Sequence, residues 1–206
     1  MMSFKPKPLF EAFFICKMDI IIITGPPYSG KGTQCEFLKE IFNYQHISTG
    51  DRCRLEKQNK TEIGLIMSQY EEKGDLVPDE IMKNLFGNIL EENSDNNGVI
   101  LDGYPRTIAQ VNDLLEIVSN RDLQISTVIN IEVPREELLK RAKKRAETSN
   151  RKDDKDKAIH LKRIDVFEDV TKPAIAYMKT KLHVEDFDGL GSIEDITDTI
   201  KSRVIN

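Results

Sequence analysis

The sequence predicts an α/β fold in three layers, with a five-stranded parallel β-sheet covered by helices on both faces. Three observations lead to this prediction. Five short strand-like runs occur along the chain, and segments with helical periodicity separate them. A glycine-rich loop follows the first run, at the kind of strand-to-helix turn that binds phosphate. The length of 206 residues suits one domain.

The predicted elements alternate along the chain. Strands are expected at residues 19–24, 45–47, 99–101, 127–133 and 183–187. Helices are expected at residues 31–42, 61–73, 78–91, 108–119, 135–146, 158–181 and 192–204. The helix predicted at 192–204 illustrates the periodicity: Ile196, Ile200 and Val204 stand four residues apart and form one apolar helical face.

Composition and charge argue against several kinds of partner. The net charge of −5 disfavours bulk nucleic acid, so we expect no nucleic-acid partner and a small phosphate ligand met by local arginines. No apolar run approaches the roughly 20 residues of a membrane span, so no membrane partner is expected. Cys16, Cys35 and Cys53 are scattered, which favours a reducing, cytoplasmic compartment and gives no zinc-ligand spacing. The three histidines are isolated, and we expect them to serve packing or the surface.

Residues 1–17 differ in composition from the rest and are interpreted as an N-terminal extension, with Met18 as an alternative start. The extension lacks arginine and has a single serine, which is atypical of an organelle presequence, although such targeting stays open. The functional domain is therefore expected at residues 18–206.

Residues 25–33, Gly-Pro-Pro-Tyr-Ser-Gly-Lys-Gly-Thr, predict a phosphate-binding loop. Four residues separate Gly25 from Gly30, and Lys31 follows at once. Glycines let backbone amides turn toward an anion, the following helix adds its positive dipole end, and the lysine adds a compact charge. An ordinary glycine turn is the alternative, but a lysine in register after a β-branched strand argues against it.

Two further motifs follow predicted strands. Ser48-Thr49-Gly50-Asp51, with Arg54 close behind, would by itself be an ordinary helix cap. Residues 99–106, Val-Ile-Leu-Asp-Gly-Tyr-Pro-Arg, deliver the carboxylate of Asp102 to a strand end, and the bond before Pro105 could be cis. Arg106 can bind two phosphate oxygens at once.

A set of arginines completes the pattern. Arg141 and Arg145 are four residues apart and share a helical face, and Arg151 and Arg163 follow. Planar guanidinium groups suit phosphate better than ammonium groups do. A basic surface helix is the alternative, and we accept it for Lys143, Lys144 and Lys152.

Together, the motifs resemble those of the adenylate kinases, the nucleoside monophosphate kinases with a short lid. Lys-Gly-Thr-Gln at 31–34, Asp-Gly-Tyr-Pro-Arg at 102–106 and Gln110 carry the resemblance, which spans residues 18–206. It implies the P-loop NTPase fold, a helical acceptor flap at about 48–77 and a short lid at about 145–154. It also implies a monomer that transfers a phosphoryl group from ATP to AMP with Mg²⁺, giving two ADP.

The resemblance implies a set of site residues. Those expected to bind ATP are Gly25, Ser29, Gly30, Lys31, Gly32, Thr33, Arg141, Arg145 and Gly191. Those expected to bind AMP are Thr49, Arg54, Leu76, Val77, Gly103, Arg106, Gln110, Arg151 and Arg163. Those expected to act on the transferring group are Lys31, Arg106, Arg141, Arg145, Arg151 and Arg163. Asp51 and Asp102 are implied to hold Mg²⁺ through water.

The chain departs from the family pattern twice. Tyr28 stands where the family has glycine, so either its Cβ stays clear of the nucleotide or the loop dihedrals change. Eight residues, 155–162, separate the pair Asp153-Asp154 from Arg163, where the family has seven. One extra residue turns a helix by about 100°, so a bulge absorbs it or Arg163 is displaced.

Two other functions stay open at this point. A UMP/CMP kinase has the same fold, but such enzymes typically carry alanine at the position of Thr49 and asparagine at that of Thr107. Thr49 and Gln110 therefore favour AMP as the acceptor. A nucleotide-binding protein without catalytic activity is the second alternative, suggested by Tyr28 and by the altered lid, and it predicts ATP binding without turnover.

Overall fold

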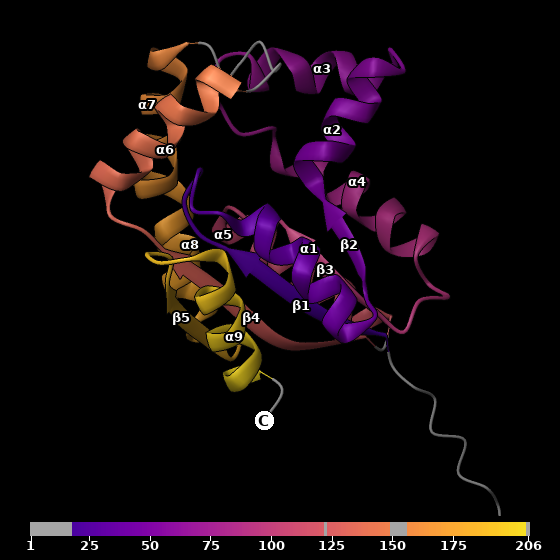
Figure 1. Ribbon diagram of the computed structural model, residues 1–206. Helices are drawn as coiled ribbons and strands as arrows, with labels where there is room; N and C mark the ends of the chain where they lie inside the picture. The colour runs from indigo at the N-terminus through magenta and orange to yellow at the C-terminus, as the bar shows by residue number, and fades with distance from the viewer. Residues whose placement is uncertain (1–17, 122, 149–155, 205–206) are drawn as a thin grey trace, which may run out of the picture.

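The computed structural model describes residues 18–121, 123–148 and 156–204, so the predicted extension and Arg151 of the predicted lid lie outside the described residues. The chain folds into the predicted three-layer α/β structure (Figure 1). The strands are β1 (Asp19–Thr24), β2 (Gln45–Ser48), β3 (Gly98–Asp102), β4 (Gln124–Glu132) and β5 (Val184–Asp188). The helices are α1 (Lys31–Phe42), α2 (Thr49–Gln58), α3 (Glu62–Glu71), α4 (Asp79–Glu92), α5 (Ile108–Asn120), α6 (Arg135–Thr148), α7 (Lys157–Val166), the π-helical segment η2 (Phe167–Thr171), α8 (Lys172–Met178) and α9 (Ile193–Val204).

All five strands pair in parallel, in the order β2-β3-β1-β4-β5. The predicted fold class is confirmed, and each predicted strand overlaps an observed one. The strand β1 lies at the centre of the sheet, and the chain leaves it toward β2 on one side and reaches β4 on the other. In open parallel sheets such a reversal leaves a crevice outside the carboxyl ends of the strands, which is where ligands bind.

Side chains of β1 alternate between two hydrophobic cores, one on each face of the sheet. Ile20 and Ile22 pack with residues of α4, α5 and α8, whereas Ile21 and Ile23 pack with residues of α1 and α9. The helices α1 and α9 lie in front of the sheet in Figure 1. All four isoleucines are buried, so the strand that carries the phosphate-binding loop is held from both sides. Among the described residues, no helix combines the length and apolar composition needed to cross a membrane.

The segment after β2 contains one more helix than the element predictions included. Residues 49–58 form α2, which packs against α3 beside the carboxyl edge of the sheet (Figure 1). Ser48 caps α2 by accepting a hydrogen bond from the backbone of Asp51 at 3.2 Å. The helix is mostly polar and buries only Thr49 and Cys53, so it has no apolar stripe by which periodicity could have revealed it.

The single helix predicted at residues 158–181 is observed as continuous helical backbone over residues 157–178, with a π-helical turn inside it. The chain forms α7, then η2, then α8, which ends at Met178. Pro173 lies in the first turn of α8. A proline there has no N–H to donate and crowds the carbonyl four residues earlier, which accounts for the irregular turn before it.

Candidate active site

Two adjoining cavities lie at the carboxyl edge of the sheet. One lies between the loop after β1 and the helices α2, α6 and α7, and the other lies between α2, α3, α4 and the turn after β3. The first, here called the central cavity, is lined by the predicted residues Gly30, Lys31, Gly32, Thr33, Asp51, Arg54, Asp102, Arg106, Arg141, Arg145 and Arg163. The second, here called the acceptor cavity, is lined by the predicted residues Thr49, Leu76, Val77, Gly103, Arg106 and Gln110. The cavities share Gly50 and Arg106.

The loop after β1 needs glycine at both of its ends. Gly25 has a φ of 138°, and a Cβ there would lie 2.4 Å from the backbone oxygen of Ile131 on β4. Gly30 has a φ of 96° and precedes the first turn of α1. Both conformations are ones that side chains oppose. The amides between them stand at the N-terminus of α1, which is a favourable place for an anion.

Lys31 folds back onto this loop. Its Nζ atom donates hydrogen bonds to the backbone oxygens of Gly25 at 2.9 Å and Pro26 at 2.7 Å. Burial lowers the pKa of Lys31 to about 8, and Arg106 and Arg145 act in the same direction while Asp102 opposes them. The lysine is thus held where a phosphate group would compete with two carbonyls for its charge.

Asp102 ends β3 and faces the loop. Burial on its own would raise the pKa of this carboxyl, but His46, Lys31 and Arg106 together lower it below its usual range. An ionised carboxylate at this position is a hard oxygen ligand of the kind that Mg²⁺ accepts, directly or through water. The residues present therefore fit a magnesium ion beside the phosphate-binding loop.

The acceptor cavity is organised by hydrogen bonds to its polar lining. Thr49 donates through Oγ1 to the backbone oxygen of Asp102 at 3.1 Å. The buried amide of Gln110 accepts from the backbone N–H of Arg106 at 2.7 Å and donates to Asp79 at 2.7 Å. Because a backbone N–H can only donate, the atom that faces it must be the amide oxygen, and the orientation of Gln110 is fixed.

The arginines reach the central cavity from four elements, namely α2, the turn after β3, α6 and α7. Arg141 donates to the backbone oxygens of Ser29 at 3.2 Å and Gly189 at 2.9 Å, which ties α6 to the phosphate-binding loop. Arg54 forms an ion pair with Asp51. Arg163 lines the cavity from α7, so the longer 155–162 segment, whose first residue lies outside the described residues, does not turn it away.

Tyr28 changes the dihedrals of the loop, which is one of the two outcomes predicted for it. Its φ is 69°, in the left-handed region. Its ring meets that of His160 on α7 edge to face, with centroids 5.2 Å apart, and its hydroxyl lies 2.5 Å from Nδ1 of His160. The guanidinium carbon of Arg145 lies 5.6 Å from the centroid of the same ring, within the range of a cation–π contact.

Some predicted residues lie apart from these two cavities. Gly191, which the structure describes, precedes α9 with a φ of 125° and lines neither of them. Ser29 is buried within the loop. Gly25 lines a third opening that also includes Lys31, Arg54 and Arg163. The peptide bond between Tyr104 and Pro105 is cis, which is the possibility that the sequence indicated for the turn after β3.

Two histidines expected to serve packing or the surface lie at the site. His46 lines the central cavity beside Asp102, and His160 bonds to Tyr28 of the loop. His46 stands two residues before Ser48 on β2, so strand alternation alone would have placed it on the same face as that motif. For His160 the sequence held no signal, since its partner lies 132 positions away.

Comparison with known proteins agrees with this geometry. A family model described as Adenylate kinase matches residues 23–183. The chain is 41% identical over 187 residues to a protein named Adenylate kinase of Parabacteroides distasonis, covering 90% of this chain and 97% of the relative. It is 40% identical over 187 residues to that of Leptospira biflexa, covering 91% and 100%, and 40% identical over 176 residues to that of Bacteroides thetaiotaomicron, covering 85% and 93%.

Proposed function

The chain belongs to the adenylate kinase family, and on this premise we propose that it transfers the terminal phosphoryl group of Mg·ATP reversibly to AMP, giving two ADP. The observation that carries the proposal is the convergence of Lys31, Asp102 and the arginines on one cavity, which shares lining residues with a second, more apolar one. One cavity suits the phosphates of a donor and an acceptor, and the other suits the base of the acceptor.

On the donor side, the loop amides and Lys31 hold the phosphates of ATP, with Gly25, Ser29, Gly32 and Thr33 forming the cradle. Arg141 and Arg145 on α6 line the same cavity as this loop. Their hydrogen bonds and ring contact already place them against the loop, at Ser29 and Tyr28. Gly191 is proposed to meet the adenine of ATP from the start of α9.

On the acceptor side, Thr49, Leu76, Val77 and Gln110 bind the base of AMP, and Arg54, Arg106 and Arg163 bind its phosphate. Val77 is buried and Leu76 is half-buried in the cavity wall, so both offer apolar contact to a planar base. Arg106 lines both cavities, which supports its proposed role between the phosphates of the two nucleotides. Gly103 lets the chain pass close to Thr49 and Arg106.

Catalysis is proposed to proceed by direct in-line transfer. The phosphate of AMP is already an anion, so the reaction needs neither a protein nucleophile nor a general base. ATP and AMP together carry about six negative charges, and phosphoryl transfer is accelerated mainly by positioning and charge neutralisation. Lys31, Arg106, Arg141, Arg145 and Arg163 supply that charge, with Arg151 proposed to join them from the lid.

Magnesium, when bound, neutralises the phosphate oxygens between which the group moves. Asp102 is the proposed anchor of its water shell, because its carboxylate is ionised and lies beside the loop. Asp51 is proposed to contribute from α2, and its carboxylate is largely exposed and paired with Arg54.

AMP is the proposed acceptor rather than UMP or CMP. The amide of Gln110 uses one of its two N–H groups on Asp79 and one lone pair of its oxygen on the backbone of Arg106. The other N–H and the other lone pair can bind the adenine edge, which presents both an acceptor and a donor. Thr49 stands where UMP/CMP kinases typically carry alanine.

We further propose that residues 18–206 act as a cytoplasmic monomer, with a flap at 48–77 and a lid at 145–154 that close over the nucleotides and exclude water. The flap proposal is supported by α2 and α3, which lie beside the sheet edge rather than within a layer.

The deciding experiment measures product formation from Mg·ATP with AMP, UMP, CMP or GMP as separate acceptors. We expect ADP to form rapidly with AMP alone. Turnover with UMP or CMP would overturn the assignment from Thr49 and Gln110. ATP binding without turnover on any acceptor would favour a binding protein.

A lysine variant tests whether the loop is the donor site. Replacing Lys31 with Met should lower kcat by about 10²- to 10³-fold, the usual loss when one electrostatic contact to a transition state is removed. Lys143→Met is the control, because Lys143 is exposed on α6 and lines neither cavity. An unchanged rate for Lys31→Met, with the control also unchanged, would place the donor site elsewhere.

A further inference from the structure

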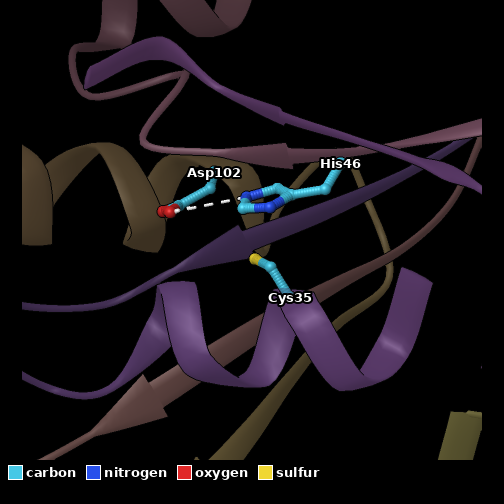
Figure 2. A group of neighbouring side chains, drawn as sticks. All are labelled: Cys35, His46 and Asp102. Carbon is cyan, nitrogen blue, oxygen red and sulfur yellow. Dashed lines mark ion pairs between the residues drawn. The ribbon is translucent and has the colours of Figure 1, made fainter. Parts of the chain in front are cut away.

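Three side chains with three kinds of donor atom lie close together (Figure 2), and two of them, His46 and Asp102, line the central cavity. Cys35 comes from α1, His46 from β2 and Asp102 from the end of β3, and their donor atoms all lie within 4.8 Å of one another. We propose that they bind a borderline-soft divalent cation of the zinc class, and that the bound cation inhibits phosphoryl transfer by occupying Asp102.

The sheet register brings these residues together. In the pairing of β2 with β3, His46 stands opposite Ile100, two residues before Asp102. Ile100 packs in the same hydrophobic core as Cys35, on the face that α1 covers. Since alternate strand residues face the same side, His46 and Asp102 both point toward α1. The group is therefore built by strand order and helix packing, and not by the rotamers of flexible surface side chains.

His46 already has the orientation of a metal-binding imidazole. Its Nδ1 atom lies 2.8 Å from a carboxylate oxygen of Glu36 on α1. Its Nε2 atom is buried and has no hydrogen-bond partner among the described residues. That atom lies 3.8 Å from Oδ2 of Asp102, in ion-pair range but too far for a hydrogen bond. Carboxylates that anchor the far nitrogen of a ligating histidine are a regular feature of metal sites.

The donor set determines the class of cation. Thiolate, imidazole and carboxylate together suit zinc, whereas Mg²⁺ prefers oxygen ligands and keeps its water. A tetrahedral zinc ion holds nitrogen and sulfur ligands about 3.5 Å apart, so small side-chain rotations would close the group around it. His46 and Asp102 line the central cavity while Cys35 lies fully buried behind them, so the cation enters from the cavity.

Binding displaces the proton of the Cys35 thiol and any proton on His46, and the cation takes their place. With Asp102 coordinated in this way, its carboxylate is no longer available to the water shell of magnesium. The inhibition rests on the proposed function, because it assumes that role for Asp102. The proposed metal binding does not depend on the proposed function.

Cobalt is the direct probe of the site, because Co²⁺ shows its ligands in its absorption spectrum. Titrating Co²⁺ into the full nucleotide-free chain should produce a thiolate-to-cobalt charge-transfer band and the intense visible bands of a tetrahedral ion. Cys35→Ser should lose the charge-transfer band. Cys53→Ser should keep it, since Cys53 is likewise buried but lies in α2 outside the group. A band that survives in Cys35→Ser would overturn the proposal.

Zinc affinity, measured by competition with a chromophoric chelator, tests the remaining partners. Glu36→Gln should weaken binding by about 10- to 100-fold, as expected for the loss of a histidine-orienting carboxylate, and His46→Gln should weaken it further. His183→Gln is the matched control, because His183 also contacts a glutamate but lies on the exposed surface before β5. Equal affinities in all four proteins would mean adventitious zinc only and would overturn the site.

Inhibition is measured separately, with free zinc set by a metal buffer because ATP itself binds zinc. Each protein is compared with its own zinc-free rate. The unmodified chain should lose activity at zinc concentrations that leave Cys35→Ser and His46→Gln at their own zinc-free rates. A cobalt spectrum as expected without zinc inhibition would overturn the inhibitory role of Asp102 and leave the metal site standing. The spectra need no turnover, so failure of the proposed kinase activity would be seen independently.

Discussion

With no phosphate bound, the side chain of Lys31 hydrogen-bonds to the backbone of its own loop. Its hydrogen bonds to Gly25 and Pro26 satisfy two backbone oxygens, and burial holds its pKa at about 8. Most lysines remain charged well above that pH. A triphosphate placed among the loop amides would favour the charged form and raise the pKa again. The protonation of this one residue is thus linked to occupancy of the loop.

Proton uptake on ATP binding follows from this linkage. At pH 9 the free lysine is mostly neutral and the bound one charged, so binding should take up close to one proton per ATP. At pH 7 the lysine is charged in both states and should contribute no uptake. Calorimetry in two buffers of different ionisation enthalpy measures the proton count at each pH. Lys143→Met should behave as the unmodified chain, and equal uptake at pH 7 and pH 9 would contradict the assignment to Lys31.

At the scale of elements, the flap depends on the close approach of α2 and α3. Gly64 is buried at their contact, and a Cβ there would lie 2.2 Å from the backbone carbon of Glu56. Thr61 caps α3 and also donates to the carboxylate of Glu56, so the same turn fixes both helices. The flap residues proposed to bind AMP can be positioned only if this contact forms.

Two glycine-to-alanine changes separate packing from helix propensity. Gly64→Ala forces side chain against backbone and should lower the free energy of unfolding by about 1–3 kcal/mol. It should also weaken AMP binding while leaving ATP binding unchanged. Gly87→Ala, in α4 with no atom within 4 Å of its added Cβ, should instead raise stability by up to about 1 kcal/mol. Denaturant unfolding and calorimetry provide both measurements, and an unaltered AMP affinity in Gly64→Ala would contradict the flap.

At the scale of the whole molecule, the sheet order places both cavities along one edge. Residues of β2 and β3 and of the loops after β1 and β3 meet α2 on one side and α6 with α7 on the other (Figure 1). Both cavities therefore belong to a single folded unit, and a ligand in either should stabilise the entire chain.

Thermodynamic linkage tests whether the two cavities are separate sites. At about 100 times its dissociation constant, a ligand that binds only the folded chain adds about 2.7 kcal/mol to the free energy of unfolding. AMP and a non-hydrolysable ATP analogue should each add this amount, and together about 5.4 kcal/mol. Chemical denaturation with each ligand and with both measures the increments. A combined increment no larger than a single one would mean that both compete for one cavity.

The sequence predicted the sheet and most of the site because their signals are local. Apolar runs marked β1, β3 and β4, more polar strand-like runs marked β2 and β5, and glycine and proline marked the turns after β1 and β3. The helix α2 was not predicted because it is polar and has no apolar stripe. The π-helical turn between α7 and α8 was not predicted because a proline in the first turn of α8 is compatible with a continuous helix. The meeting of Cys35 with His46 depends on β2 lying beside β3 and beneath α1, and strand order has no local signal.

Tyr28 links the phosphate-binding loop to α7, a helix far away in the sequence. Its hydroxyl meets His160 across 132 positions of sequence, while its backbone occupies a conformation that glycine would adopt freely. A chain with glycine at this position has no ring to receive, so position 160 is released from its constraint. Here, a replacement at either position removes one contact of the other, and we expect the two residues to be exchanged as a pair.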